Sequence, residues 1–98
     1  MAGYLVAIAR IDNMKPGLKA YIEEAAQLST EYGGEYIIRG PAAVVSEGEH
    51  FTNRSLVVSK FESFEKAKEF YYSDDYQNKI KPLREGTGEY DVALFEGA

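Results

Sequence analysis

The chain has no cysteine and no tryptophan, and only one histidine among its 98 residues. The lack of cysteine excludes disulfide bonds, thiolate nucleophiles and metal sites with sulfur ligands. With a single imidazole, the sequence also has no metal-ligand cluster and no Ser-His-Asp signature. We therefore expect a protein that holds no metal, haem or other cofactor.

Long apolar runs and basic clusters are absent as well. The N-terminal run YLVAIA has six residues and no basic segment before it, so it resembles a strand rather than a signal peptide, and a membrane span needs roughly 18. The net charge is −5, whereas nucleic-acid binding needs clustered Lys and Arg. The RSLVVSKF segment also lacks the glycine-aromatic pattern of RNA-binding strands. We expect a cytoplasmic protein without a membrane or nucleic-acid partner.

What the chain does have is the composition of an ordinary globular domain. Hydrophobic residues make up 45% of it and charged residues 28%. A chain of this length forms one domain, here residues 1–98, with a thin core that gains much from self-association. A homodimer is plausible from size alone.

The hydrophobic periodicity predicts four strands and two helical regions. Apolar residues alternate on both faces of the segments 4–11, 35–39, 54–61 and 90–96, and the second of these strands can resume through 42–47 after the Gly-Pro break. The spacing of three and four residues predicts a helix over 16–32. Ser63 can cap a second helix, which continues in interrupted form until Pro82.

The order βαββαβ predicts an α+β fold of the ferredoxin-like type, with a four-stranded antiparallel sheet and both helices on one face. Because the predicted strands are apolar on both sides, the opposite face needs a cover. A second copy of the sheet is the simplest candidate. The expected assembly is a dimeric α+β barrel.

Three stretches of the sequence carry a family resemblance: YGGEYIIRG, FESFEKAKEFYYSDDYQ with the later LR, and the closing FEG. Over nearly its whole length the chain resembles the DUF1330 family of the dimeric α+β barrel superfamily. The resemblance implies the fold and the dimer but no reaction. Because the wider superfamily includes cofactor-independent monooxygenases and haem-degrading enzymes, it implies a small-molecule pocket by analogy. The chain lacks the tryptophan of the haem-degrading relatives, and it has Pro41 where the family often has a second glycine.

Arg39 is the leading candidate for binding a ligand, because it lies late in an apolar strand beside a backbone break. A guanidinium presents a planar fork to a carboxylate. That carboxylate could be internal, from Glu47 or Asp91, or it could belong to an anionic ligand. The other arginines near strand or helix ends, Arg10, Arg54 and Arg84, are weaker candidates that we expect at the surface.

The remaining candidates are one histidine and several tyrosines. His50 could act as a general base, because its pKa lies near neutrality, or it could be an exposed residue of the predicted hairpin loop. Tyr36 and Tyr76 could line a binding site for a planar ligand. Tyr76 also falls on consecutive helical turns with Tyr71 and Tyr72, where core packing or a dimer contact is the alternative.

Two functions fit these features. The first is a small dimeric enzyme or binding protein for an aromatic or carboxylated metabolite, in which Arg39 holds the anion, Tyr36 and Tyr76 form the wall and His50 moves a proton. The second is a non-enzymatic module that senses a ligand or serves dimerisation.

Overall fold

The computed structural model describes residues 1–98 and contains the predicted elements in the predicted order. The strands are β1 (Gly3–Ile11), β2 (Glu35–Pro41), β3 (Ser55–Phe61) and β4 (Gly88–Glu96). The helices are α1 (Pro16–Glu31) and α2 (Phe64–Tyr71), followed by a π-helical turn, η1 (Asp75–Ile80), and a 3-10 turn, η2 (Lys81–Arg84). The second strand does not resume, because residues 42–54 form an irregular loop with no strand pairing.

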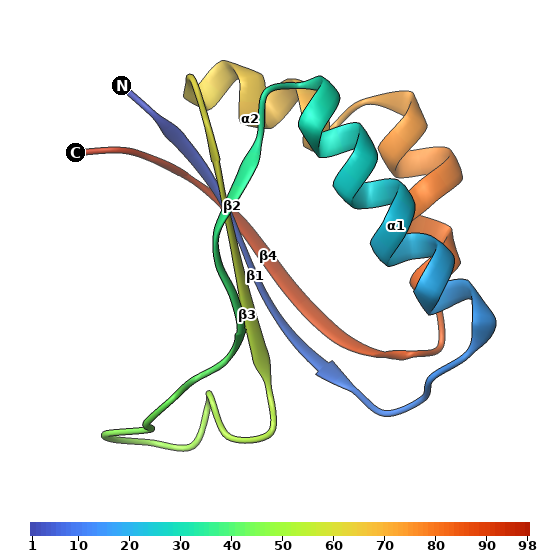
Figure 1. Ribbon diagram of the computed structural model, residues 1–98, viewed down its shortest axis with the longest axis vertical. Helices are drawn as coiled ribbons and strands as arrows, with labels where there is room; N and C mark the ends of the chain where they lie inside the picture. Colours follow the sequence, from blue (N-terminus) through green and yellow to red (C-terminus); the bar gives the residue numbers. More distant parts are fainter.

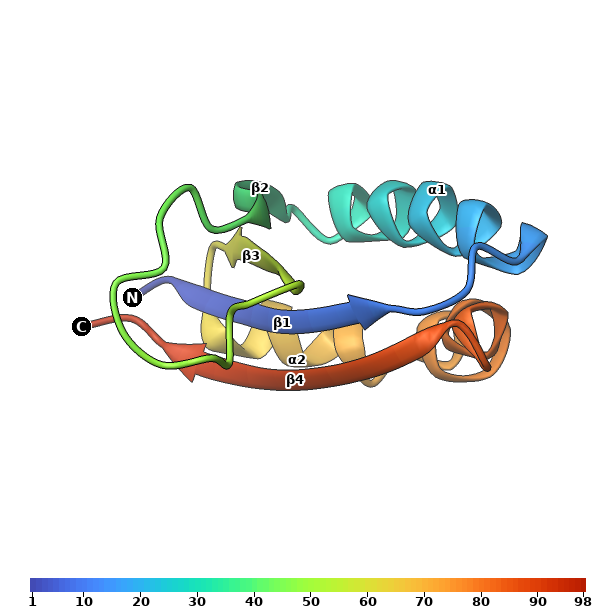
Figure 2. The same cartoon turned by 90° about the horizontal axis from the view of Figure 1, so that it is seen from below.

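The four strands form one antiparallel sheet in the order β2-β3-β1-β4, as Figure 2 shows. β1 is central and pairs with β3 and β4 along its length. The register between β2 and β3 shifts between Tyr36 and Ile38, so Ile37 forms a bulge in the edge strand. The fold class expected from the sequence, an α+β ferredoxin-like arrangement, is confirmed.

Both helices and the two turns cover the same face of the sheet (Figure 1). The core lies between these layers and is rich in aromatic rings, which are linked by stacked and edge contacts. Its buried members include Leu5, Leu28, Phe61, Ala67, Phe70, Tyr76 and Ile80. This packing explains the predicted periodicity of α1 and α2, because the apolar stripe of each helix faces the sheet.

The chain between α2 and β4 is held by specific local contacts. Ser63 caps α2 by accepting a hydrogen bond from the Lys66 backbone N–H at 3.1 Å, as the sequence predicted. Ser73 then joins α2 to η1, because its hydroxyl donates to the Phe70 carbonyl and accepts from the Tyr76 N–H. The π-helical turn that follows directs Tyr76 and Ile80 into the core.

The opposite face of the sheet has no helix over it (Figure 1). The register places Tyr4, Val6 and Ile8 of β1 on this face, because Leu5, Ala7 and Ala9 line the space beneath α1. Apolar neighbours on the edge strands are strongly exposed: Ile38 is 50% exposed and Phe95 51%. We call this surface, which includes Tyr4, Val6, Ile8, Ile38 and Phe95, the open face.

Candidate functional site

A cavity of about 330 Å³ lies between α1 and the sheet. Its floor consists of small and apolar residues of the sheet, including Leu5, Ala7, Ala9 and Val57, and its roof consists of residues of α1, including Leu18, Ile22 and Ala25. The small alanine side chains leave the space into which a ligand could fit. The volume lies within the range of ligand pockets, about 300–1,000 Å³.

Arg84 is the polar residue that distinguishes this cavity. It lines the cavity and is only 9% exposed. Its guanidinium forms no ion pair; its side-chain contacts are one hydrogen bond, from Nη1 to the Tyr21 hydroxyl at 3.2 Å, and the faces of two tyrosine rings. The guanidinium carbon lies 4.2 Å from the ring centroid of Tyr90 and 5.3 Å from that of Tyr21. Arg84 is thus a buried cation without a counter-charge.

Tyrosine hydroxyls surround this cation. The hydroxyls of Tyr21 and Tyr76 are 2.7 Å apart, and Tyr21 also accepts the hydrogen bond from Arg84. Burial raises the pKa of the Tyr76 hydroxyl, and the nearby Tyr21 raises it further. Tyr76 therefore keeps its proton at neutral pH and can donate it in a hydrogen bond. We call Arg84, Tyr21 and Tyr76 the Arg84 group.

Close packing of η2 places Arg84 in the cavity. A Cβ atom at Gly17 in the first turn of α1 would collide with the Leu83 carbonyl oxygen, so only glycine allows η2 to approach α1 this closely. On the other side, the fully buried Thr87 donates to the Arg84 carbonyl oxygen and shares a hydrogen bond with the Tyr90 hydroxyl. Residues from α1, η2 and β4 together hold the guanidinium in place.

A second cation lies at the edge of the same cavity, on β2. Arg39 is exposed, and its guanidinium carbon lies 4.8 Å from the ring centroid of Tyr36. Both residues line the cavity. Arg39 forms no ion pair, whether with Glu47, Asp91 or any other carboxylate. Burial raises the pKa of the Tyr36 hydroxyl, which stays protonated.

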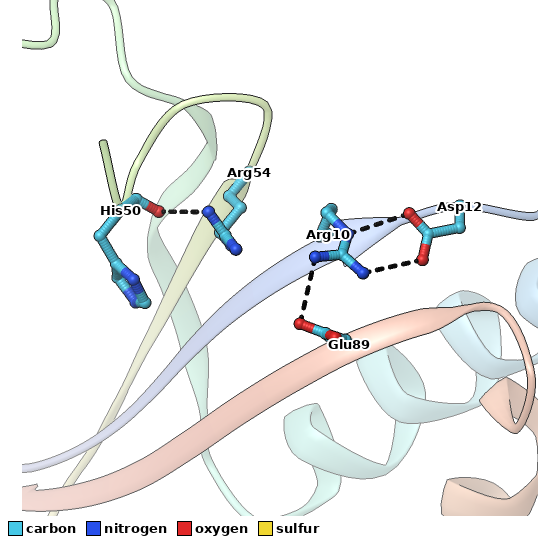
Figure 3. Close-up of polar contacts among 5 residues, drawn as sticks. All are labelled: Arg10, Asp12, His50, Arg54 and Glu89. Carbon is cyan, nitrogen blue, oxygen red and sulfur yellow. Dashed lines mark hydrogen bonds and ion pairs between the residues drawn. The ribbon is translucent and has the colours of Figure 1, made fainter.

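The structure brings three of the four predicted site residues together, because Tyr36, Arg39 and Tyr76 line one cavity. His50 is not among the lining residues. It lies in the exposed loop after β2, where its backbone carbonyl accepts a hydrogen bond from Arg54 (Figure 3). Its role as a general base remains a prediction.

The weaker arginine candidates have different outcomes. Arg10 forms ion pairs with Asp12 at 3.0 Å and Glu89 at 3.2 Å, outside the cavity (Figure 3). The hydrogen bond from Arg10 lowers the pKa of the Asp12 carboxyl. The expectation that Arg84 lies at the surface is wrong, because tertiary packing against α1 and β4 buries it. No local sequence pattern marks this residue.

The lining of the cavity consists of arginine and hydroxyl groups and of apolar surface. No Asp, Glu, His or Lys lines it, so its only charged groups are the two arginines. No group of three or more His, Cys, Asp or Glu residues in the structure is arranged to hold a metal ion. None of the helices has the length and apolar character needed to cross a bilayer.

The fold resembles several solved structures, all at low sequence identity. A protein of unknown function from Rhodopseudomonas palustris, RPA0582, matches with a TM-score of 0.71 and 11% identity, over 99% of this chain and 82% of that one. SnoaB, a cofactor-independent oxygenase from Streptomyces nogalater, matches with a TM-score of 0.65 and 8% identity, over 99% and 93%. A dimeric ferredoxin-like protein of unknown function from Thermobifida fusca matches with a TM-score of 0.54 and 9% identity, over 99% and 92%.

In sequence, no curated protein matches this chain. Residues 2–98 do match a family that is described as "Domain of unknown function (DUF1330)". The match spans almost the whole chain and agrees with the resemblance carried by the YGGEYIIRG and FEG stretches. The chain belongs to the DUF1330 family.

Proposed function

We propose that the cavity binds a small molecule that combines an apolar or aromatic body with an anionic group, and that no metal takes part. The observation that carries this proposal is the buried, unpaired guanidinium of Arg84. Arg84 and Tyr76 contact the anionic group at one end of the ligand. Arg39 and Tyr36 contact the other end of the ligand, at the edge of the cavity. The alanine-rich floor accommodates the apolar body.

The energetics of Arg84 support a ligand anion. A guanidinium cannot lose its proton in a protein, so burial leaves a permanent charge that is costly unless it is paired. The ring faces of Tyr21 and Tyr90 and a single hydrogen bond compensate it in part. An anion in the cavity would supply the missing charge and accept hydrogen bonds from the remaining N–H groups of Arg84.

One observation favours binding without chemistry, which is the second candidate function: a ligand-sensing module. The cavity has no carboxylate, imidazole or amine that could act as a base at neutral pH. The similarity to the oxygenase SnoaB supports an enzymatic function only through the shared fold. In this proposal His50 does not contact the ligand, because it does not line the cavity. If turnover is found, a His50→Gln variant tests whether His50 contributes to it.

We also propose a homodimer that forms through the open face. Ile38 and Phe95 expose apolar surface there, and monomers rarely leave such a sheet face uncovered. A second copy of the chain is the occupant that best fits, because the same apolar surface is then complementary to itself. The solved relative from Thermobifida fusca is described as dimeric.

Isothermal titration calorimetry with benzoate and benzamide tests the binding function. These two molecules have nearly the same shape, but only benzoate carries a charge. We expect benzoate to bind with at least about tenfold higher affinity than benzamide, because hydrogen bonds to a charged group contribute about 1.5–3 kcal/mol. We expect Arg84→Gln to remove this preference. Equal binding of both molecules, or of neither, would refute the proposal.

The control for this titration is Lys19→Gln. Lys19 lies on the exposed side of α1, forms no ion pair and does not line the cavity. The variant removes the same unit of charge from the protein as Arg84→Gln. If Lys19→Gln weakened benzoate binding as much as Arg84→Gln does, the effect would reflect net charge rather than a site.

A further inference from the structure

We infer that the cavity ionises an acidic hydroxyl of its ligand, a phenol or an enol, so that the Arg84 group binds the resulting oxyanion. This inference rests on the proposed function and deepens it, because it names the class of ligand and what binding does to it. Binding alone then activates the ligand, since a phenolate or enolate is far more electron-rich than its parent hydroxyl. No base on the protein is required.

The hydrogen-bond directions support this inference. The Arg84 guanidinium can only donate, so the Tyr21 oxygen is the acceptor of their hydrogen bond. Tyr21 and Tyr76 share one hydrogen between their oxygens at 2.7 Å, which leaves the other phenolic hydrogen without a partner. The Arg84 group therefore offers a ligand one O–H donor and the unused N–H donors of the guanidinium. An oxyanion satisfies such a set of donors better than a neutral hydroxyl does.

The charged groups that line the cavity also favour ionisation of the ligand hydroxyl. The titratable and charged side chains that line the cavity come from α1, η1, η2, β4 and β2, and they are Tyr21, Tyr76, Arg84, Tyr90, Tyr36 and Arg39. β1, β3 and α2 contribute no titratable residue to the lining. A hydroxyl bound by the Arg84 group meets one buried cation and no anion, because Arg39 lies on β2, at the opposite edge of the sheet from β4, whose Tyr90 packs against Arg84. A nearby cation and hydrogen bonds to the charged form both lower the pKa of an acid.

Desolvation opposes ionisation, but here its cost is reduced. Burial of an acidic hydroxyl in an apolar cavity disfavours its charged form. The protein has already buried the Arg84 cation before any ligand arrives, so its desolvation is not a new cost of binding. The O–H bond of the ligand breaks, its electron pair stays on the oxygen, and the proton passes to bulk water, since no base lines the cavity.

The inference can be tested with p-nitrophenol, whose phenolate form absorbs visible light. The wild-type protein at saturating concentration is titrated with acid and base, and the apparent pKa of the bound dye is read from its absorbance. We expect this pKa to lie about one unit or more below that of the free dye, which corresponds to at least about tenfold tighter binding of the phenolate than of the phenol. p-Nitroanisole, which cannot ionise, should bind more weakly by a similar factor at a pH above the pKa of the free dye.

Two variants locate the effect. Tyr76→Phe removes a single hydroxyl from the Arg84 group, and Arg84→Gln removes its charge; we expect both to return the dye pKa toward its free value. Tyr71→Phe is the matched control, because Tyr71 contacts the Tyr76 ring at 5.1 Å between centroids but does not line the cavity. An unshifted or raised dye pKa, or no dye binding, would overturn the inference. If benzoate still bound in an Arg84-dependent manner, the proposed function would stand without it.

Discussion

Arg84 Nη1 donates a hydrogen bond of 3.2 Å to the hydroxyl of Tyr21, 63 residues away in sequence, and no carboxylate forms an ion pair with that guanidinium. The contact joins η2 to α1 across the end of the cavity. A structural arginine buried to this degree normally has an acid beside it. The proposed function assigns the missing counter-charge of Arg84 to a ligand.

A structural role and a ligand-binding role of Arg84 predict different changes in the free energy of unfolding when the residue is replaced. We expect Arg84→Gln to change the free energy of unfolding by less than about 1 kcal/mol without ligand, because no buried carboxylate loses its partner. A structural ion pair would instead cost about 3–5 kcal/mol on removal of one member. Urea denaturation of both proteins measures the difference. A loss in the higher range would assign Arg84 to the scaffold.

A second prediction concerns Arg39 at the edge of the cavity. We expect Arg39→Ala to weaken benzoate binding by about three- to tenfold, a smaller effect than that of Arg84→Gln, because an exposed cation interacts more weakly through water. The stability and the oligomeric state should not change, since Arg39 forms no ion pair. Calorimetry and light scattering check the two parts. A large loss of stability in the ligand-free variant would instead make Arg39 structural.

The difference between these arginines shows what the sequence could and could not predict. Arg39 stood out because it interrupts an apolar strand, and the register confirms that strand. Arg84 lies in the KPLREG segment, which reads as a polar turn after Pro82. Its burial depends on α1, where Gly17 allows the close approach of η2 and Tyr21 contacts the guanidinium, and both residues lie more than 60 positions away. No local sequence window contains this signal.

The fold, by contrast, was predicted well, because local and periodic signals determine it. In β1 and β4, alternate residues face opposite sides of the sheet. In α1 and α2, the apolar stripe marks the side of the helix that packs on the sheet. The error lies at Pro41, after which apolar residues at 42–47 suggested a further strand. Proline has no backbone N–H to donate to a ladder, and the chain leaves the sheet there.

Gly17 offers a test of how the Arg84 group is assembled. We expect Gly17→Ala to cost about 1–3 kcal/mol of stability, although alanine favours helices, because its Cβ would force α1 away from the Leu83 carbonyl. Benzoate binding should weaken as the Arg84–Tyr21 contact opens. Urea denaturation and calorimetry measure the two effects. Lys19→Ala, on the exposed side of α1, controls for changes in helix propensity; equal stability of both variants would contradict the proposed close approach.

The buried hydroxyl of Tyr76 predicts how stability changes at alkaline pH. Its folded pKa is raised above that of an unfolded tyrosine, near 10, so the unfolded chain releases this proton first. The stabilisation is complete below about pH 10 and is lost as the pH rises above that value. We expect Tyr76→Phe to flatten this decline in urea melts between about pH 8 and 11. Tyr71→Phe should change the slope much less, because Tyr71 makes only a minor contribution to the raised pKa of Tyr76. An unchanged slope in Tyr76→Phe would contradict the prediction.

The last prediction concerns the homodimer. If a second copy covers the open face, the wild-type protein sediments at about 22 kDa, twice the chain mass of 11.0 kDa, at micromolar concentration. Phe95→Glu should shift it toward the monomer, because the interface would then bury one added carboxylate from each copy without a partner.

The matched control for Phe95→Glu is Tyr72→Glu. Tyr72 is an aromatic residue exposed to 66% at the end of α2, on the helical side of the sheet. The same charge there should leave the dimer intact, since the open face is untouched. Sedimentation of both variants, together with circular dichroism to establish that they fold, decides the matter. A wild-type mass near 11 kDa throughout, or equal dissociation by both variants, would show that the open face is not the interface.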